Sequence, residues 1–285
     1  MYETFYHNLP NGVQIVHRKT LSPVVYVGIM IGAGTRHEQP EENGMAHYIE
    51  HCLFKGTEHY TARQIINHIE GIGGEINAYT TKEETTFYAA TLNNHFRTTL
   101  HLLADMVLRP TFNKKETDKE VTVILDEIES YNDSPSELIY DDFENMVFEG
   151  SSLAMPILGT KKTLRRISKS PDIALNWMKT HYRPERMVLF VLGNVTTQQV
   201  VAAALAVAAG DQGLLLGAAG NLGKAGQGII FAQNADDGLA VTALGNESVG
   251  NVLGGNILDG EAVLSENILH QLAALLFLTG EFGIV

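Results

Sequence analysis

The stretch that decides the fold around it covers residues 43–51 and reads NGMAHYIEH. Asn43 is a residue type that caps helices, so we expect a helix over about residues 44–54. Positions four apart lie on the same face of a helix, so His47 and His51 can each direct one ring nitrogen at a common ion. This spacing predicts half of a zinc site.

The residue between the two histidines suggests what such a site does. Two histidines and one carboxylate, with a fourth position left for water, form the open ligand set of catalytic zinc, which lowers the pKa of that water to about 7. Glu50 lies on the same helix face, and its carboxylate can accept the proton of the zinc-bound water. The pattern His-x-x-Glu-His arises by chance on the order of a few times per hundred His-rich chains, so alone it is only suggestive. The other nine histidines lack this spacing, and we expect ordinary hydrogen bonds for them.

Strand and helix patterns alternate on both sides of this helix. Alternating apolar residues around a turn at Leu9-Pro10-Asn11-Gly12 predict a hairpin over residues 3–18. Further strands are predicted at 24–31, 75–80, 85–92 and 187–192. Helices are predicted from Thr61 to the glycines at 71–74 and at 94–108, 115–131, 136–148, 161–168 and 171–182. This order predicts an α+β fold in which helices pack on one face of a mostly antiparallel sheet.

Composition excludes several classes of protein. The formal net charge of -13 disfavours a nucleic-acid partner, because phosphate binding depends on clustered Lys and Arg. No apolar run reaches the length of a membrane span, so we expect no membrane partner. Cys52 is the single cysteine, which excludes an intrachain disulfide and fits a reducing compartment. A cytoplasmic location is therefore the expectation.

The composition changes after about residue 200. Residues 201–285 contain 15 of the 27 glycines and eight acidic residues, but Lys224 is their only Lys or Arg. Residues 200–209 fit a helix, and beyond them no period of 3.6 or 2 is evident, so we assign no structure there. We expect a domain over residues 1–200 and a tail over 201–285. The tail is either a shortened second domain or a stretch that is not the native continuation.

Further motifs follow the helix in a fixed order. They are LFKGT (53–57), GGEINAYT (73–80), TTFY (85–88), EVTVILDEI (120–128), DSP (133–135), ILGT (157–160) and YRPERM (182–187). From about Tyr6 to Val195 the chain thus resembles the inverted-motif zinc peptidases of the pitrilysin and mitochondrial-processing-peptidase family. Order and spacing together make coincidence very improbable. The resemblance implies the fold of one half of a processing peptidase.

The resemblance also implies a role for particular residues. It places the third zinc ligand on Glu127, which with His47 and His51 completes a site for one Zn²⁺ per chain. Glu120 matches a family glutamate that supports the metal site, although it could also be a solvated helix carboxylate. Asn77 and Ala78 match positions that hold the substrate backbone at an edge strand, and their alternative role is turn formation.

The sequence therefore predicts a zinc-dependent endopeptidase that hydrolyses peptides or unfolded protein segments. Family members normally have a second, similar half with an Arg and a Tyr that act on the substrate, and nothing after residue 200 matches it. We accordingly expect a homologous partner chain or a missing second half to complete the site. One alternative is a noncatalytic subunit that binds peptides or a partner of a processing-peptidase-like assembly. Another is a structural zinc site, which the open fourth position disfavours.

Overall fold

The computed structural model of the chain describes residues 3–210, 229–233 and 239–243. The chain divides into two compact units, Met1–Gly220 and Asn221–Val285. The second unit contains an antiparallel hairpin of β7 (Ile229–Gln233) and β8 (Leu239–Ala243), where the sequence analysis assigns no structure. In the first unit α8 (Thr197–Gly210) continues across residue 200. The domain division at that residue stays a prediction, and most of the expected tail lies outside the described residues.

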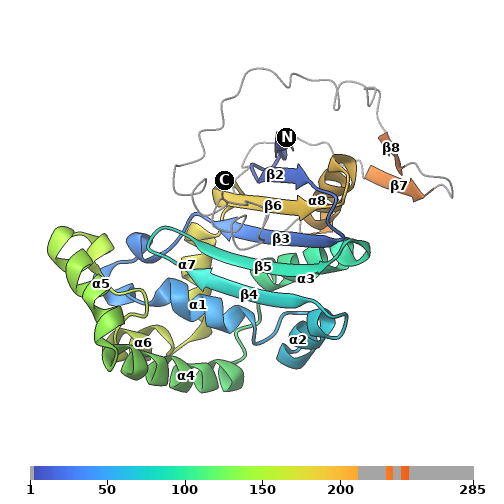
Figure 1. The fold of residues 1–285 in the computed structure, drawn as a ribbon. Helices are drawn as coiled ribbons and strands as arrows, with labels where there is room; N and C mark the ends of the chain where they lie inside the picture. Colours follow the sequence, from blue (N-terminus) through green and yellow to red (C-terminus); the bar gives the residue numbers. More distant parts are fainter. Residues whose placement is uncertain (1–2, 211–228, 234–238, 244–285) are drawn as a thin grey trace. The chain divides into compact units, whose positions relative to one another are not determined.

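A six-stranded sheet forms the centre of the first unit, in the strand order β1-β2-β6-β3-β5-β4 (Figure 1). Its strands are β1 (Thr4–Asn8), β2 (Gln14–Lys19), β3 (Val24–Ile31), β4 (Glu75–Thr80), β5 (Thr85–Leu92) and β6 (Met187–Gly193). All neighbouring strands are antiparallel except β2 and β6, which are parallel. The mostly antiparallel sheet is therefore confirmed, and β3, β4 and β5 have their predicted bounds.

One face of this sheet is packed against helices. The helices of the first unit, besides α8, are α1 (Met45–Leu53), α2 (Ala62–Glu70), α3 (Phe96–Leu108), α4 (Lys114–Asn132), α5 (Pro135–Val147), α6 (Lys161–Ile167) and α7 (Pro171–His181). In the central strand β3, Ile29 is in register with Phe87 of β5 and Leu189 of β6. These three side chains belong to one buried cluster with residues of α1, α3, α7 and α8. Each such large apolar side chain contributes about 1.5–3 kcal/mol when fully buried.

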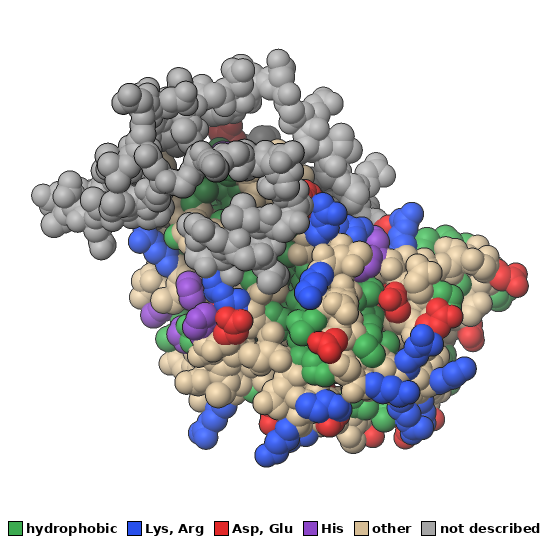
Figure 2. Space-filling view, turned by 180° about the vertical axis from the view of Figure 1, so that it is seen from behind, with side chains coloured by type: hydrophobic (Ala, Val, Ile, Leu, Met, Phe, Trp, Pro, Cys, Tyr) green, Lys and Arg blue, Asp and Glu red, His purple; other side chains and the backbone are tan. Residues whose placement is uncertain are grey.

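Helix α5 is the exception, because none of its residues is buried. Five of its large apolar side chains are exposed, namely Ile139, Tyr140, Phe143, Met146 and Val147. Figure 2 shows hydrophobic side chains interspersed with acidic ones at the right-hand end of the molecule, which α5 forms. Among the described residues, no helix has both the length and the apolar character that a bilayer span requires.

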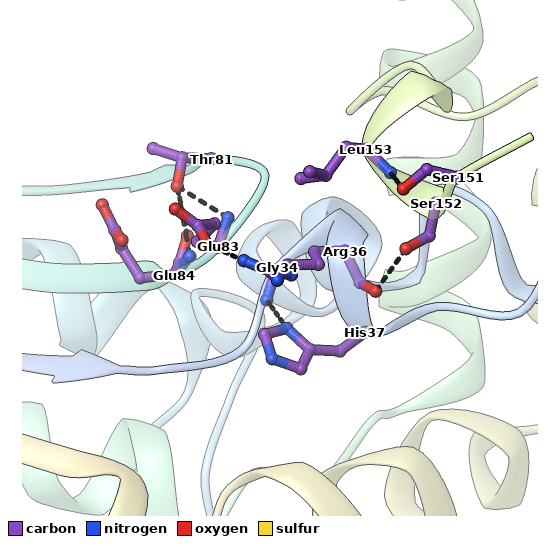
Figure 3. A network of polar contacts seen from close by, with 9 residues as sticks. All are labelled: Gly34, Arg36, His37, Thr81, Glu83, Glu84, Ser151, Ser152 and Leu153. Atoms are coloured by element: carbon purple, nitrogen blue, oxygen red, sulfur yellow. Dashed lines mark hydrogen bonds and ion pairs between the residues drawn. The ribbon is translucent and has the colours of Figure 1, made fainter. Parts of the chain in front are cut away.

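A network of polar contacts holds the end of β4 (Figure 3). The turn between β4 and β5 spans residues 81–84, and the backbone N–H of Arg36 donates to the carbonyl of Lys82 at 2.7 Å. The Arg36 guanidinium forms an ion pair with Glu83. From the other side, the Ser152 hydroxyl donates to the Arg36 carbonyl at 2.6 Å. These contacts fix the turn at the end of β4, the edge strand that lies next to α1.

Candidate metal centre

Helix α1, which carries both histidines, begins at a position whose backbone conformation requires glycine. Gly44 has φ +90°, in the left-handed region, and a Cβ there would lie 2.8 Å from the carbonyl oxygen of Leu158. The expected cap is wrong, because Asn43 does not bond the helix. Its Nδ2 instead donates to the carbonyl of Pro156 at 2.8 Å and to Glu38 at 3.2 Å.

The Glu38 carboxylate takes the place of that cap. Its two oxygens accept the backbone N–H groups of Gly44 and Ala46, each at 2.8 Å. Glu38 is 3% exposed, and burial raises the pKa of its carboxyl to about 7, although these hydrogen bonds oppose the shift. A buried carboxylate at the N-terminus of the helix thus sets where α1 starts, and with it the direction of the two histidines, about one and two turns further on.

The two histidines and Glu127 converge. The Nε2 atoms of His47 and His51 lie 3.2 Å apart. Glu127 reaches them from α4, with its Oε2 3.7 Å from Nε2 of His47 and 3.5 Å from Nε2 of His51. Among the described residues, these three form the one group of acidic, histidine or cysteine side chains that could hold a metal ion.

This triangle of atoms has the size that a zinc ion requires. Bonds of about 2.0–2.1 Å in tetrahedral geometry place neighbouring ligand atoms about 3.3 Å apart. The three measured separations, 3.2, 3.5 and 3.7 Å, bracket that value. The side chain of Glu127 is 42% exposed, so the centre opens toward solvent on one side. The residues therefore fit a zinc ion with room for a fourth ligand.

The protonation of the two histidines differs. Burial, together with the nearby His51, lowers the pKa of His47 to about 4, which keeps the imidazole neutral and its lone pair free for a metal. Burial alone would lower the pKa of His51, but hydrogen bonds with Glu127 and Glu120 outweigh it and raise that pKa. The hydrogen bond with His51 lowers the pKa of Glu127, so its carboxylate is ionised at neutral pH.

Glu120 lies directly behind one ligand. Its Oε2 is 3.2 Å from Nδ1 of His51, the ring nitrogen that faces away from the triangle, and the residue is 7% exposed. A carboxylate at this position fixes the ring orientation and the tautomer of a metal-binding histidine. This position differs from that of a solvated helix carboxylate.

Glu50 stands beside the triangle without joining it. Burial raises the pKa of its carboxyl. The nearby charge of Glu127 raises this pKa further, whereas that of His51 lowers it. The Thr80 hydroxyl, at the end of β4, donates to Oε2 of Glu50 at 2.6 Å. Thr80 is a site residue that the sequence analysis missed, although it lies at the end of the GGEINAYT motif.

The strand β4, which carries Asn77 and Ala78, is the free edge of the sheet next to α1. In the turn that follows β4, the Thr81 N–H donates to the Glu84 carbonyl. Because antiparallel strands alternate their bonding direction, the backbone groups of Ala78 and Thr80 point away from β5. Consistently, the Ala78 N–H is bound by the Asn77 side chain, at 2.8 Å. This edge therefore offers backbone groups to an added strand.

Comparison with known proteins gives a consistent result. The family described as "Insulinase (Peptidase family M16)" matches residues 14–161, and "Peptidase M16 inactive domain" matches residues 170–207. An "Uncharacterized zinc protease YmxG" of Bacillus subtilis is 41% identical over 188 residues, which are 65% of this chain and 45% of that protein. The "Probable mitochondrial-processing peptidase subunit beta" of Arabidopsis thaliana is 37% identical over 200 residues, 70% of this chain and 37% of that protein.

A solved structure agrees on the fold. A protease from Helicobacter pylori superposes with a TM-score of 0.67 at 23% identity, covering 71% of this chain and 49% of that one. The chain thus spans about half the length of the relatives it matches.

Proposed function

The chain belongs to the insulinase family, peptidase family M16, and from this premise we propose that it is the metal-binding half of a zinc-dependent endopeptidase. His47, His51 and Glu127 hold one zinc ion in this proposal. The observation that carries it is the triangle of three ligand atoms separated by 3.2–3.7 Å. The zinc-protease name of the Bacillus subtilis relative supports the choice of metal.

Glu50 acts as the general base in this proposal. A bound zinc ion polarises a peptide carbonyl and makes a nearby water molecule acidic. Glu50 accepts the proton of the attacking water and later delivers it to the leaving amine. Its raised pKa suits a group that both takes and returns a proton, and Thr80 holds the carboxylate in place. Glu120 keeps His51 oriented throughout.

The substrate in this proposal is an extended peptide or an unfolded protein segment. It adds as a strand to the free edge of β4, and the small side chain of Ala78 allows close approach to the metal. Asn77 exchanges its bond with the Ala78 N–H for one with the substrate backbone. A homologous partner chain or a second half provides the opposite wall. The cytoplasmic location expected from the sequence is part of the same proposal.

The test combines metal analysis with cleavage of a quenched peptide library. We expect the wild-type chain to bind one zinc ion. Glu50→Gln should keep the zinc and lose hydrolysis, because an amide cannot accept the proton. Glu129→Gln, two residues after the ligand Glu127 and paired with Lys161 at the surface, is the matched control that keeps both.

Each outcome has a distinct meaning. If the chain binds zinc but shows no Glu50-dependent hydrolysis, even with a homologous partner chain added, it is a noncatalytic subunit and the proposal fails. Hydrolysis that survives Glu50→Gln would remove Glu50 as the base. A wild-type chain without zinc affinity would refute the metal site itself.

A further inference from the structure

Glu120 has two oxygens, and each contacts a different partner. Oε2 faces Nδ1 of His51 at 3.2 Å, whereas Oε1 lies 2.7 Å from the ammonium nitrogen of Lys55. We propose that Lys55 is a positioning residue of the metal centre and acts on His51 through Glu120. The inference rests on the proposed zinc site. Lys55 contacts Glu120, which in turn contacts the proposed ligand His51.

The burial of Glu120 explains why a cation is needed there. Its side chain is 9% exposed, and a carboxylate removed from water is costly unless it is paired. His51 is a weak partner for this purpose, because a metal ligand is a neutral imidazole. Lys55 supplies a full positive charge at hydrogen-bond distance. It thereby balances the carboxylate and leaves the second oxygen free to face His51.

The backbone of Lys55 is also bonded to helix α1, so the position of Lys55 follows that of the helix. The helix ends at Leu53, with Phe54 as its cap. The N–H of Lys55 donates to the Cys52 carbonyl at 3.0 Å, so the backbone of Lys55 is fixed to the helix that carries His51. The contacts run from α1 through Lys55 to Glu120 on α4 and back to His51 on α1. This closed loop joins the two helices that contribute the metal ligands.

A simpler role for Lys55 is that of a cation at a helix C-terminus, which interacts with the helix dipole and little else. Two observations argue against it. The Lys55 side chain is 27% exposed, less than Lys119 at 60%, which pairs with Glu116 on the surface of α4. The partner of Lys55 is a buried carboxylate on another helix, at 2.7 Å.

The experiment measures zinc affinity by chelator competition for the full chain, in a double-mutant cycle of Lys55→Met and Glu120→Gln. We expect Lys55→Met to weaken zinc binding about tenfold, at the lower end of the range for groups behind a ligand. In the Glu120→Gln background the same change should have an effect below about twofold, because coupled residues are not additive. Lys119→Met is the matched control and should leave the affinity unchanged.

Two further readouts separate positioning from folding. The visible spectrum of the Co²⁺-loaded chain should shift in Lys55→Met, because the His51 ring changes orientation, and Lys55→Arg should restore it. Melting of the metal-free chain reports any loss of stability. If Lys55→Met does not fold, Lys55→Gln provides the same comparison.

The inference is overturned if Lys55→Met binds zinc within about twofold of the wild type, or if its effect is equally large in the Glu120→Gln background. Either result leaves the zinc site intact. A wild-type chain that binds no zinc is a different failure, since it removes the proposed function first.

Discussion

Helices α1 and α5 have similar amphipathic patterns but very different surroundings. In α1, seven of nine residues are buried, and they include the proposed ligand His47. In α5, none of the 13 residues is buried, and the helix carries five exposed large apolar side chains. The contrast shows that an apolar stripe predicts a helix but not its burial. The position of α1 is specified by the hydrogen bonds at its start and by the packing of its buried side chains. Helix α5 buries none of its residues, and its ion pairs are polar contacts with Lys82.

Removal of a ligand from α1 should have the largest effect. We expect His51→Ala to lose more than about 100-fold in zinc affinity, beyond the range for groups behind a ligand. Chelator competition measures this loss. Tyr140→Ala in α5 is the control and should bind zinc as the wild type does. Equal zinc affinities for His51→Ala and Tyr140→Ala would show that α1 contributes no more to metal binding than α5 does.

Truncation of a core side chain in α1 should have the next largest effect. Ile49 is fully buried, so Ile49→Ala should cost about 2–5 kcal/mol in the free energy of unfolding. Urea denaturation of the metal-free chain gives this value. Ile49→Val should cost only about 0.5–1.5 kcal/mol. A cost below that of Ile49→Val would show that α1 is packed less tightly than the structure has it.

The buried cap of α1 should make stability depend on pH. The pKa of Glu38 is about 7 in the folded chain against an ordinary value of 4.5, so the folded state holds its proton more tightly. The stabilisation is fully present below about pH 4.5 and is lost as pH rises through about 7, with a total of up to about 3 kcal/mol at 1.36 kcal/mol per pKa unit.

Unfolding of the metal-free chain at pH 5 and pH 8 tests this dependence. Glu38→Gln should lose this fall in stability, because the amide does not titrate. The Ile139→Ala variant of α5 should retain it. The same pH dependence in Glu38→Gln and in the wild type would assign it to another group.

Substitutions on α5 should have the smallest effects. Met146 is 80% exposed, so Met146→Gln should change the free energy of unfolding by no more than about 0.5 kcal/mol. Urea denaturation again provides the measurement. A cost near that of Ile49→Ala would mean that α5 is packed in solution and would erase the contrast.

Much of this architecture could be predicted from local sequence. Strands β3, β4 and β5 match their predicted bounds, because each is an apolar or alternating run that ends at turn residues. Thr61 caps α2 as expected, with its hydroxyl accepting the N–H of Gln64. The i, i+4 spacing of His47 and His51 likewise predicts their convergence, since helix geometry alone fixes it.

What could not be predicted depends on residues distant in sequence. Asn43 is a residue type that caps helices, but the Glu38 carboxylate accepts the N–H groups at the start of α1, and only the intervening turns bring it there. Thr80 bonds Glu50 across 30 positions, and Lys55, in the turn after α1, pairs with Glu120 of α4. Local patterns specify elements, whereas these contacts form only when the elements pack.

The parallel pairing of β2 with β6 has a consequence for how the chain folds. Strand β6 lies between β2 and β3, so the sheet stays incomplete until residues 187–193 leave the ribosome. Glu127 precedes β6 by roughly 60 residues, or about 3–12 s of synthesis at 5–20 residues per second. During that interval all three proposed metal ligands are already synthesised, while the gap between β2 and β3 is still open. Insertion of β6 is a long-range step of the kind that slows folding, so the nascent chain carries the whole set of proposed ligands before its sheet closes.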